Sequence, residues 1–205
     1  MFTKRINLAS TITAVLVALF TSIGGQTVAK AQADNNSEVN KQIARIRAAT
    51  AKYHDVNVAI ADGYVQLGSP CIEIPGLGTD GIHYTNLPRF LQPGVTLEEP
   101  EQLVYVPTRN GGLRLVSVEY DNLALYIDAT GAIPGVFPSF QFPLPANLVE
   151  VAGPFSIAGQ TSTGPFIDPI HGTPWFYFKH VWVWAENPNG MFADFNPRLS
   201  CTPGN

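Results

Sequence analysis

Cysteine is scarce in this chain: Cys71 and Cys201 are its two cysteines, and no C-x-x-C pair occurs. That scarcity excludes a disulfide-dense scaffold, and it disfavours a redox or nucleophilic thiol. A bridge between the two would close a loop of 130 residues (201 − 71) and stabilise the fold by at most about 4–5 kcal/mol. We therefore expect a supporting disulfide between Cys71 and Cys201.

Several well-known functional motifs are absent. The sequence has no G-x-S-x-G nucleophile elbow, no H-E-x-x-H, no P-loop, no EF-hand loop and no G-x-G-x-x-G after a strand. It also lacks the H-x-H pair that is usual in cupin-like metal barrels. The common hydrolase, nucleotide-binding and calcium-binding signatures are thereby excluded, and the question of whether the protein is an enzyme stays open.

Long apolar runs are missing except at the N-terminus. Lys4 and Arg5 precede an apolar stretch over 12–23, and small residues follow at 29–31 and 31–33. This layout predicts a cleavable export peptide over 1–33, followed by a single domain over 34–205 that is periplasmic or secreted. An uncleaved anchor is the alternative, although the run is short for a membrane span. After cleavage we expect no membrane association.

Basic residues are scarce in the predicted mature chain. Removing the three basic residues of the leader leaves 9 Lys and Arg against 16 Asp and Glu, a formal charge of −7. Nucleic acid and anionic lipid are therefore disfavoured as partners. The expected partner is a small molecule or another extracellular ligand whose identity the sequence does not give.

The periodicity of apolar residues predicts an α+β fold. Apolar residues recur at near-helical spacing over 37–62, which predicts one long amphipathic helix ended by Gly63. Beyond it, Pro and Gly separate short β-rich runs, which predict a mainly antiparallel sheet or sandwich with long Pro/Gly-rich loops. The clearest strands are expected at 82–85, 103–107, 113–120, 123–127 and 175–184. The turn at 110–112 predicts a hairpin, and 131–174 is expected to be mostly loop.

Three side chains from different predicted strands form the candidate site. Alternation places His180 on an aromatic face, and it places Glu119 at the end of a row that begins with Leu113 and Leu115. His83 lies in another short strand beside apolar neighbours. Two imidazoles and a carboxylate are ligand types that a divalent transition metal prefers. His83, Glu119 and His180 are therefore the candidate metal ligands, with His171 in a Pro-rich loop as a further candidate.

Two other interpretations of the same residues remain open. The histidines can be core residues satisfied by carbonyl groups, and Glu119 can be paired with Arg114 or Lys179. In that case the aromatic strand and Pro-rich loops suit a non-catalytic binding or interaction module with a structural disulfide. The residue types alone do not choose between that module and a metal site.

Five segments share a recognisable pattern: Ala48 to Val56, Ala61 to Tyr64, Gly81 to Tyr84, Leu115 to Tyr120 and, most specifically, His180 to Cys201. Together they resemble a family of exported bacterial proteins. That last segment reads His-Val-Trp-Val-Trp, then Asn-Pro-Asn-Gly-Met-Phe, then Asn-Pro-Arg. The resemblance covers most of the mature chain. It implies an exported bacterial domain and implies no mechanism.

Overall fold

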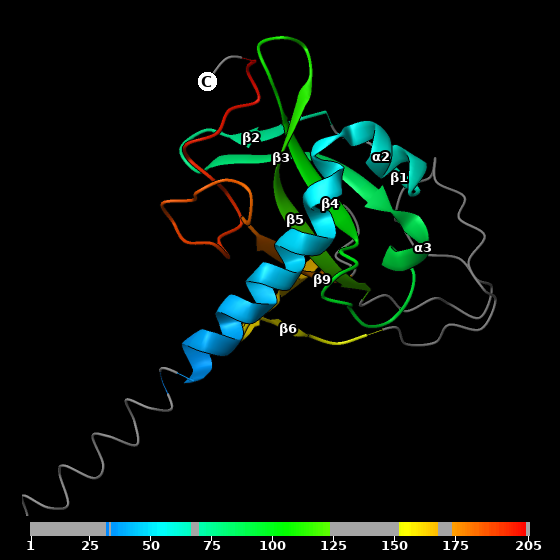
Figure 1. The fold of residues 1–205 in the computed structure, drawn as a ribbon, viewed down its shortest axis with the longest axis vertical. Helices are drawn as coiled ribbons and strands as arrows, with labels where there is room; N and C mark the ends of the chain where they lie inside the picture. The colour runs from blue at the N-terminus through cyan, green and yellow to red at the C-terminus, as the bar shows by residue number, and fades with distance from the viewer. Residues whose placement is uncertain (1–31, 33, 67–69, 124–151, 168–173, 204–205) are drawn as a thin grey trace, which may run out of the picture. The chain divides into compact units, whose positions relative to one another are not determined.

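The computed structural model describes residues 32, 34–66, 70–123, 152–167 and 174–203. The chain divides into two compact units, residues 1–41 and residues 42–205. In the first unit the described residues 34–41 are helical. The expected export peptide over 1–33 lies almost entirely outside the described residues. The sheet and the candidate site lie in the second unit (Figure 1).

The N-terminal helix is shorter than the sequence predicts. It runs over residues 34–50 and tightens into the 3₁₀ turn η1 (Ala51–His54). Asp55 then adopts an extended conformation and caps a separate helix, α2 (Val56–Ala61), where its side chain accepts a hydrogen bond from the Asn57 N–H. The single helix predicted over 37–62 is therefore wrong at Asp55, because that carboxylate begins a new helix.

Seven antiparallel strands form the main sheet, which confirms the α+β prediction. Their order is β1-β3-β4-β5-β9-β8, and β2 also pairs with β3. The strands are β1 (Tyr64–Gln66), β2 (Ile72–Ile74), β3 (Gly78–Asn86), β4 (Gln102–Pro107), β5 (Leu113–Leu123), β8 (Thr163–Ile167) and β9 (Pro174–Val181). A small hairpin, β6 (Ser156–Ile157) with β7 (Gln160–Thr161), stands apart.

The predicted strands at 82–85, 103–107 and 113–120 lie within β3, β4 and β5, and the hairpin over 110–112 is confirmed. The predicted strands at 113–120 and 123–127 are not separated by a break, because β5 continues to Leu123. Residues 124–127 lie outside the described residues. In the segment expected to be loop, β8 was missed. β8 is an edge strand, and an edge tolerates its Pro165.

A β-bulge in β5 corrects the predicted row of residues. Tyr105 lies opposite Leu115, whereas Val104 lies opposite Ser117, so Val116 is an extra residue. Neighbouring residues of β4 point to opposite faces, which puts Leu115 and Ser117 on opposite faces of β5. The expected single apolar-to-acidic face over 113–119 is therefore wrong. The bulge moves Glu119 away from the face that carries Leu115.

The Leu115 face of the sheet packs on the N-terminal helix. Ile46 and Tyr53 of the helix are buried there, and the Tyr105 hydroxyl donates to the backbone carbonyl of Tyr53 at 2.7 Å. On the sheet, the fully buried side chains of this layer include Leu103, Tyr105, Leu115, Val118 and Tyr120. Burying each aliphatic side chain contributes roughly 1.5–3 kcal/mol. The opposite face of the sheet carries a smaller buried apolar cluster, which includes Val104 and Trp182, and buried polar residues lie beside that cluster.

Strand β9 ends sooner than predicted. Its pairing stops at Val181, and the N–H of Trp182 bonds instead to the carbonyl of Met191. Trp182 remains on the same face as His180, and their rings stack with centroids 5.8 Å apart. Trp184 does not share that face, because its indole N–H donates to Thr50 on the helix. The aromatic row predicted for 175–184 is thus broken after Trp182.

Residues 186–201, which we name the C-terminal strap, turn back toward the sheet after β9. The disulfide between Cys71 and Cys201 ties the end of the strap to the chain just before β2, as the sequence predicts. Figure 1 shows the strap in orange and red beside β2 and β3. Asn196 within it is fully buried and pairs with Thr79 of β3. The strap is therefore an integrated part of the fold.

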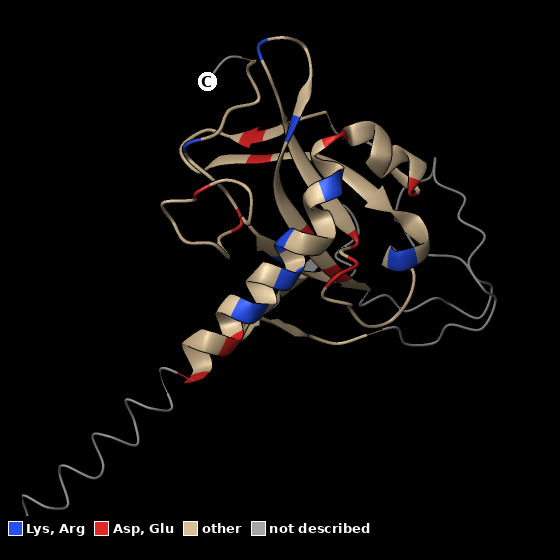
Figure 2. Cartoon of the chain, viewed as in Figure 1, with Lys and Arg blue, Asp and Glu red and all other residues tan. Residues whose placement is uncertain are grey.

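Charged residues are unevenly distributed over this unit. Arg45, Arg47 and Lys52 lie on the N-terminal helix, whereas Glu101, Glu119 and Asp121 are buried in or beside the sheet (Figure 2). A short helix, α3 (Leu87–Phe90), follows β3 and carries Arg89. Within the described part of the chain, no helix has the length and apolar character that crossing a membrane requires.

Candidate metal centre

The polar face of the sheet brings the candidate residues together. Thr85, Gln102, Glu119 and His180 form a directly opposed row across β3, β4, β5 and β9. His83 points to the same face, since it lies two residues before Thr85. Because opposed side chains in an antiparallel sheet lie about 4.5–5.5 Å apart at Cβ, the register alone places Glu119 beside His180.

Asp80 joins this face through a second β-bulge. Ile72 of β2 pairs with Gly81 and Glu73 pairs with Thr79, so Asp80 is an extra residue on β3. In a regular strand, residues three apart such as Asp80 and His83 would point to opposite faces. The extra residue of the bulge turns Asp80 to the same face as His83, and the Asp80 carboxylate lies 3.4 Å from Nε2 of His83.

Gly81 makes this bulge feasible. Its φ of +123° lies in a region that side-chain-bearing residues rarely adopt. A Cβ at this position would also lie 2.5 Å from Cγ1 of Val104 and 2.9 Å from the carbonyl oxygen of Tyr105. β3 and β4 can approach each other here only because the residue is glycine.

We predict that Gly81→Ala lowers the free energy of unfolding by about 2–4 kcal/mol, because the strain and the overlap with β4 add. Urea denaturation measures the change. The matched control is Gly153→Ala, where φ is not positive and a Cβ would meet no atom of the described residues within 4 Å. Equal stability of the two variants would contradict the assigned role of Gly81.

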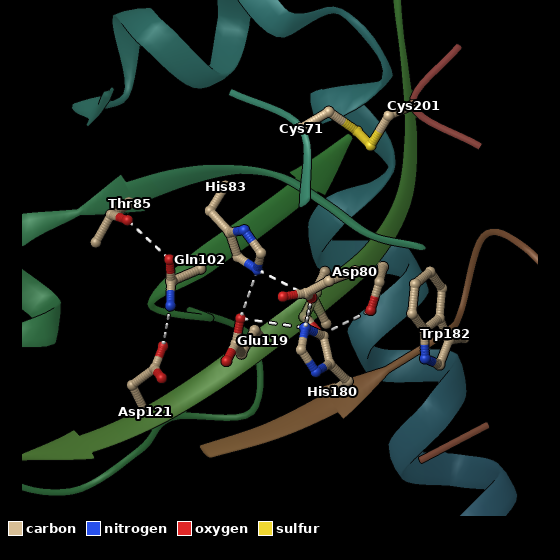
Figure 3. A network of polar contacts seen from close by, with 12 residues as sticks. Cys71, Asp80, His83, Thr85, Gln102, Glu119, Asp121, His180, Trp182 and Cys201 are labelled. Carbon is tan, nitrogen blue, oxygen red and sulfur yellow. Dashed lines mark hydrogen bonds and ion pairs between the residues drawn. A yellow bond between two sulfur atoms is a disulfide. The ribbon is translucent and has the colours of Figure 1, made fainter. Parts of the chain in front are cut away.

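Four side chains converge at the centre of this face, and we call Asp80, His83, Glu119 and His180 the His–carboxylate cluster (Figure 3). Nε2 of His83 lies 3.0 Å from Oε2 of Glu119 and 3.4 Å from Oδ1 of Asp80. Nε2 of His180 lies 3.0 Å from the same Asp80 oxygen and 3.2 Å from the same Glu119 oxygen. The ligand atoms of Asp80, His83 and His180 all lie within 4.8 Å of one another. Each ring nitrogen thus faces two carboxylate oxygens at once.

These short contacts are not made as hydrogen bonds. Nε2 of His180, Oδ1 of Asp80 and Oε2 of Glu119 are buried, and within the described residues none has a hydrogen-bond partner of acceptable geometry. Nδ1 of His180 is also buried without such a partner there. One N–H cannot be well aligned with two separate oxygens at the same time, and here the nitrogen and oxygen atoms face one another without the alignment that a hydrogen bond needs. Unpartnered buried polar atoms are costly, and their grouping requires an explanation.

Opposite charges nevertheless control the protonation of the cluster. Burial alone would lower the pKa of His83, but the carboxylates of Asp80 and Glu119 raise it to about 10. Burial alone would lower the pKa of His180 as well, but the carboxylates of Glu119 and Asp80 raise it. Burial would raise the pKa of Glu119, but the two imidazoles lower it to about 2, and they also lower the pKa of Asp80. Without a metal, the cluster is a pair of imidazolium ions held between two carboxylates.

A second polar network extends along the same row. Thr85 Oγ1 donates to Gln102 Oε1 at 2.8 Å, and Gln102 Nε2 donates to Asp121 Oδ2 at 3.0 Å. The Asp121 N–H donates to Oε2 of Glu101. Burial, together with the nearby Glu119 and Glu101 carboxylates, raises the pKa of Asp121 well above its ordinary value. This network fixes the backbone beside Glu119.

One side of the cluster reaches solvent. The side chains of His83 and Asp80 are 15% and 16% exposed, whereas those of His180 and Glu119 are 3% and 4% exposed. Trp182 stacks on His180, and Phe178 meets it edge-on at 6.0 Å between centroids. An ion can therefore enter from the Asp80 and His83 side, while aromatic rings shield the His180 side.

The structure brings His83, Glu119 and His180 together, the three residues selected from the sequence. Neither Arg114 nor Lys179 pairs with Glu119: its ion pairs are with the histidines, and Lys179 donates to Thr163. His171 lies outside the described residues. Asp80 was missed, although an Asp-Gly pair just before the strand of His83 is a signal for a bulge or turn.

Comparison with known proteins gave no relative: neither a family model, nor a curated protein, nor a solved structure matches the chain.

Proposed function

We propose that this chain is an exported protein whose domain binds one divalent transition metal ion through the His–carboxylate cluster. The ligands would be Nε2 of His83, Nε2 of His180, and carboxylate oxygens of Asp80 and Glu119. The basic and apolar leader over 1–33, together with the Cys71–Cys201 disulfide, supports the export half of the proposal.

The observation that carries the metal half is the set of short, misaligned contacts in the cluster. Metal bonds of about 2.1 Å place neighbouring ligand atoms about 3.0 Å apart in octahedral geometry and about 3.4 Å apart in tetrahedral geometry. The four nitrogen–oxygen distances, 3.0, 3.0, 3.2 and 3.4 Å, fall in this range. Each imidazole nitrogen is thus spaced from both carboxylate oxygens like neighbouring ligands of one ion, and the residues whose ligand atoms all lie within 4.8 Å of one another are Asp80, His83 and His180. The contacts lack the alignment of hydrogen bonds.

The donor set narrows the class of metal. Two imidazole nitrogens with carboxylate oxygens suit zinc, iron, copper or manganese, and the absence of sulfur disfavours Cu(I). Calcium and magnesium prefer all-oxygen sites. We therefore expect a first-row transition ion, and Zn²⁺ and Co²⁺ are the natural probes.

Metal binding should release protons. The raised pKa values of His83 and His180 mean that both imidazoles hold protons at pH 7 in the metal-free protein. A metal binds only the unprotonated nitrogen, so each Zn²⁺ displaces between one and two protons. The affinity should then rise with pH through the neutral range. Calorimetry in two buffers of different ionisation enthalpy counts the protons, and a count of zero would contradict coordination by these histidines.

The test of the proposal itself uses untagged mature protein stripped of metal with a chelator. Elemental analysis after dialysis against Zn²⁺ should give one zinc per chain. Asp80→Asn should lower the bound amount, because the amide oxygen is a weaker ligand of similar shape. The control Asp62→Asn changes an exposed carboxylate that pairs with Lys52 and should leave it unchanged. Zinc-free protein with an intact fold would overturn the proposal.

A further inference from the structure

The C-terminal strap is attached to β3 directly beside Asp80. The Thr79 N–H donates to the Asn196 carbonyl at 3.0 Å, and the Asn196 N–H donates back to the Thr79 carbonyl at 2.9 Å. The pairing of β3 with β4 begins at Ile82, opposite Tyr105, and the isolated bridge to Asn196 lies three residues earlier on β3. The strap is therefore hydrogen-bonded to the part of β3 that β4 does not reach, at the residue just before the proposed ligand Asp80.

Three further contacts hold the strap at this point. Thr79 Oγ1 donates to the Leu199 carbonyl at 2.8 Å. Gly78 lies so close to the strap that a Cβ would be 2.6 Å from the backbone of Asn196. On the neighbouring strand, Oε2 of Glu73 accepts hydrogen bonds from Ser200 Oγ and the Cys201 N–H. The disulfide closes this arrangement covalently, since it joins Cys201 to the chain that enters β2.

The other part of the strap contacts the surroundings of His180. The Trp182 N–H donates to the Met191 carbonyl, and the Trp182 indole N–H donates to the Ala193 carbonyl. Trp182 stacks on the imidazole of His180 at an interplanar angle of 20°. The strap thus supports two proposed ligands: Asp80 on β3 through Thr79, and His180 on β9 through Trp182.

We propose that the disulfide-locked strap sets the metal affinity of the His–carboxylate cluster, so that the oxidised protein binds the ion more tightly than the reduced protein. The inference rests on the proposed metal-binding function. A dithiol reductant would transfer two electrons and two protons to the Cys71–Cys201 bond, giving two thiols and a cyclic disulfide of the reductant. The freed strap would then no longer fix the bulge that carries Asp80.

The experiment compares the wild-type protein with Cys71→Ser/Cys201→Ser, because serine avoids both a reductant and new thiol ligands. We expect the double variant to bind Zn²⁺ about 10- to 100-fold more weakly, the range typical of lost support for metal ligands. With Co²⁺ in place of zinc, its visible absorption bands should shift, since the ligands would adopt a different geometry. Circular dichroism verifies that the variant is folded.

A second variant keeps the disulfide and removes one strap contact. Thr79→Val replaces the hydroxyl that bonds to Leu199 with a methyl group of similar volume, and we expect it to weaken Zn²⁺ binding and shift the Co²⁺ bands in the same direction. The matched control is Thr50→Val, which removes another fully buried hydroxyl, on the helix. It should lose stability and leave both metal readouts unchanged.

The outcomes separate the two proposals. If the wild-type protein binds neither zinc nor cobalt, the metal-binding function and this inference both fail. If the wild-type protein binds zinc and the folded Cys71→Ser/Cys201→Ser and Thr79→Val variants match it in affinity and Co²⁺ spectrum, only the role of the strap is overturned. If the double variant does not fold, the Zn²⁺ affinities and Co²⁺ spectra of Thr79→Val and Thr50→Val are compared instead. Equal values in these two variants would then overturn the role of the strap.

Discussion

Replacing His180 with alanine should lower the affinity of the protein for Zn²⁺ by at least about 100-fold. His180 is the least exposed of the four proposed ligands, and its Nε2 lies 3.0 and 3.2 Å from the oxygens of Asp80 and Glu119. Loss of a residue that only supports a ligand typically costs 10- to 100-fold in affinity, and loss of a ligand should cost more. Competition with a chromophoric chelator at pH 7.5 measures the change.

The control for this substitution is His54→Ala. His54 is exposed on η1, and its ring contacts Trp184, not the His–carboxylate cluster. The affinity for Zn²⁺ should stay within about twofold of the wild-type value. If His54→Ala and His180→Ala weakened binding equally, or if neither did, zinc would be bound elsewhere and the assignment of His180 would be wrong.

Replacing Glu101 with glutamine should stabilise the metal-free protein at alkaline pH. Burial raises the pKa of Glu101 to about 8 from its ordinary value of 4.5. Between these two values the folded state holds one proton more than the unfolded state. A rise in pH therefore lowers the stability, by about 1.4 kcal/mol per pH unit for this group. Glutamine is uncharged and can still accept the hydrogen bond from the Asp121 N–H.

The gain from Glu101→Gln should accordingly be small at pH 4.5, grow as the pH rises, and level off above about pH 8 on the order of several kcal/mol. Urea denaturation at four pH values between 4.5 and 9, in the presence of a chelator, gives the curve. Glu99→Gln is the control, because Glu99 is exposed and pairs with Arg89 at the surface. Its effect should stay below about 1 kcal/mol at every pH. If the difference in unfolding free energy between Glu101→Gln and the wild-type protein did not change with pH, Glu101 would not be a buried, protonated carboxyl group.

The positions of β3, β4, β5 and β9 could be predicted because each is bounded by Pro, Gly or a turn and carries β-branched or aromatic residues. The shorter strands β1, β2, β6, β7 and β8 were not predicted. The hairpin of β4 and β5 follows directly from the Asn110-Gly111-Gly112 turn. The two bulges could not be predicted. A bulge exists only where two residues of one strand lie opposite one residue of the partner strand. The pairing of β2 with β3 and of β4 with β5, which locates both bulges, is known only from the folded structure.

The same reason explains how much of the site was predictable. Residue chemistry selected His83, Glu119 and His180 correctly as neighbours, because a buried histidine or carboxylate needs a polar partner. The face expected for Glu119 was nevertheless wrong, since regular alternation groups it with Leu115 and Val116 interrupts that alternation. Asp80 stayed hidden because its spacing of three from His83 suits opposite faces in an unbulged strand. Sequence patterns select the ligand types, and the bulges set their directions.

Anomalous diffraction at the zinc edge would show whether Asp80, His83, Glu119 and His180 enclose one transition metal ion. The crystals would be of mature protein grown with a stoichiometric amount of Zn²⁺. We expect a single strong peak at about 2.0–2.1 Å from Nε2 of both histidines and at bonding distance from the Asp80 carboxylate. A map with no peak between the two imidazoles, in a crystal where these side chains are well ordered, would contradict this expectation.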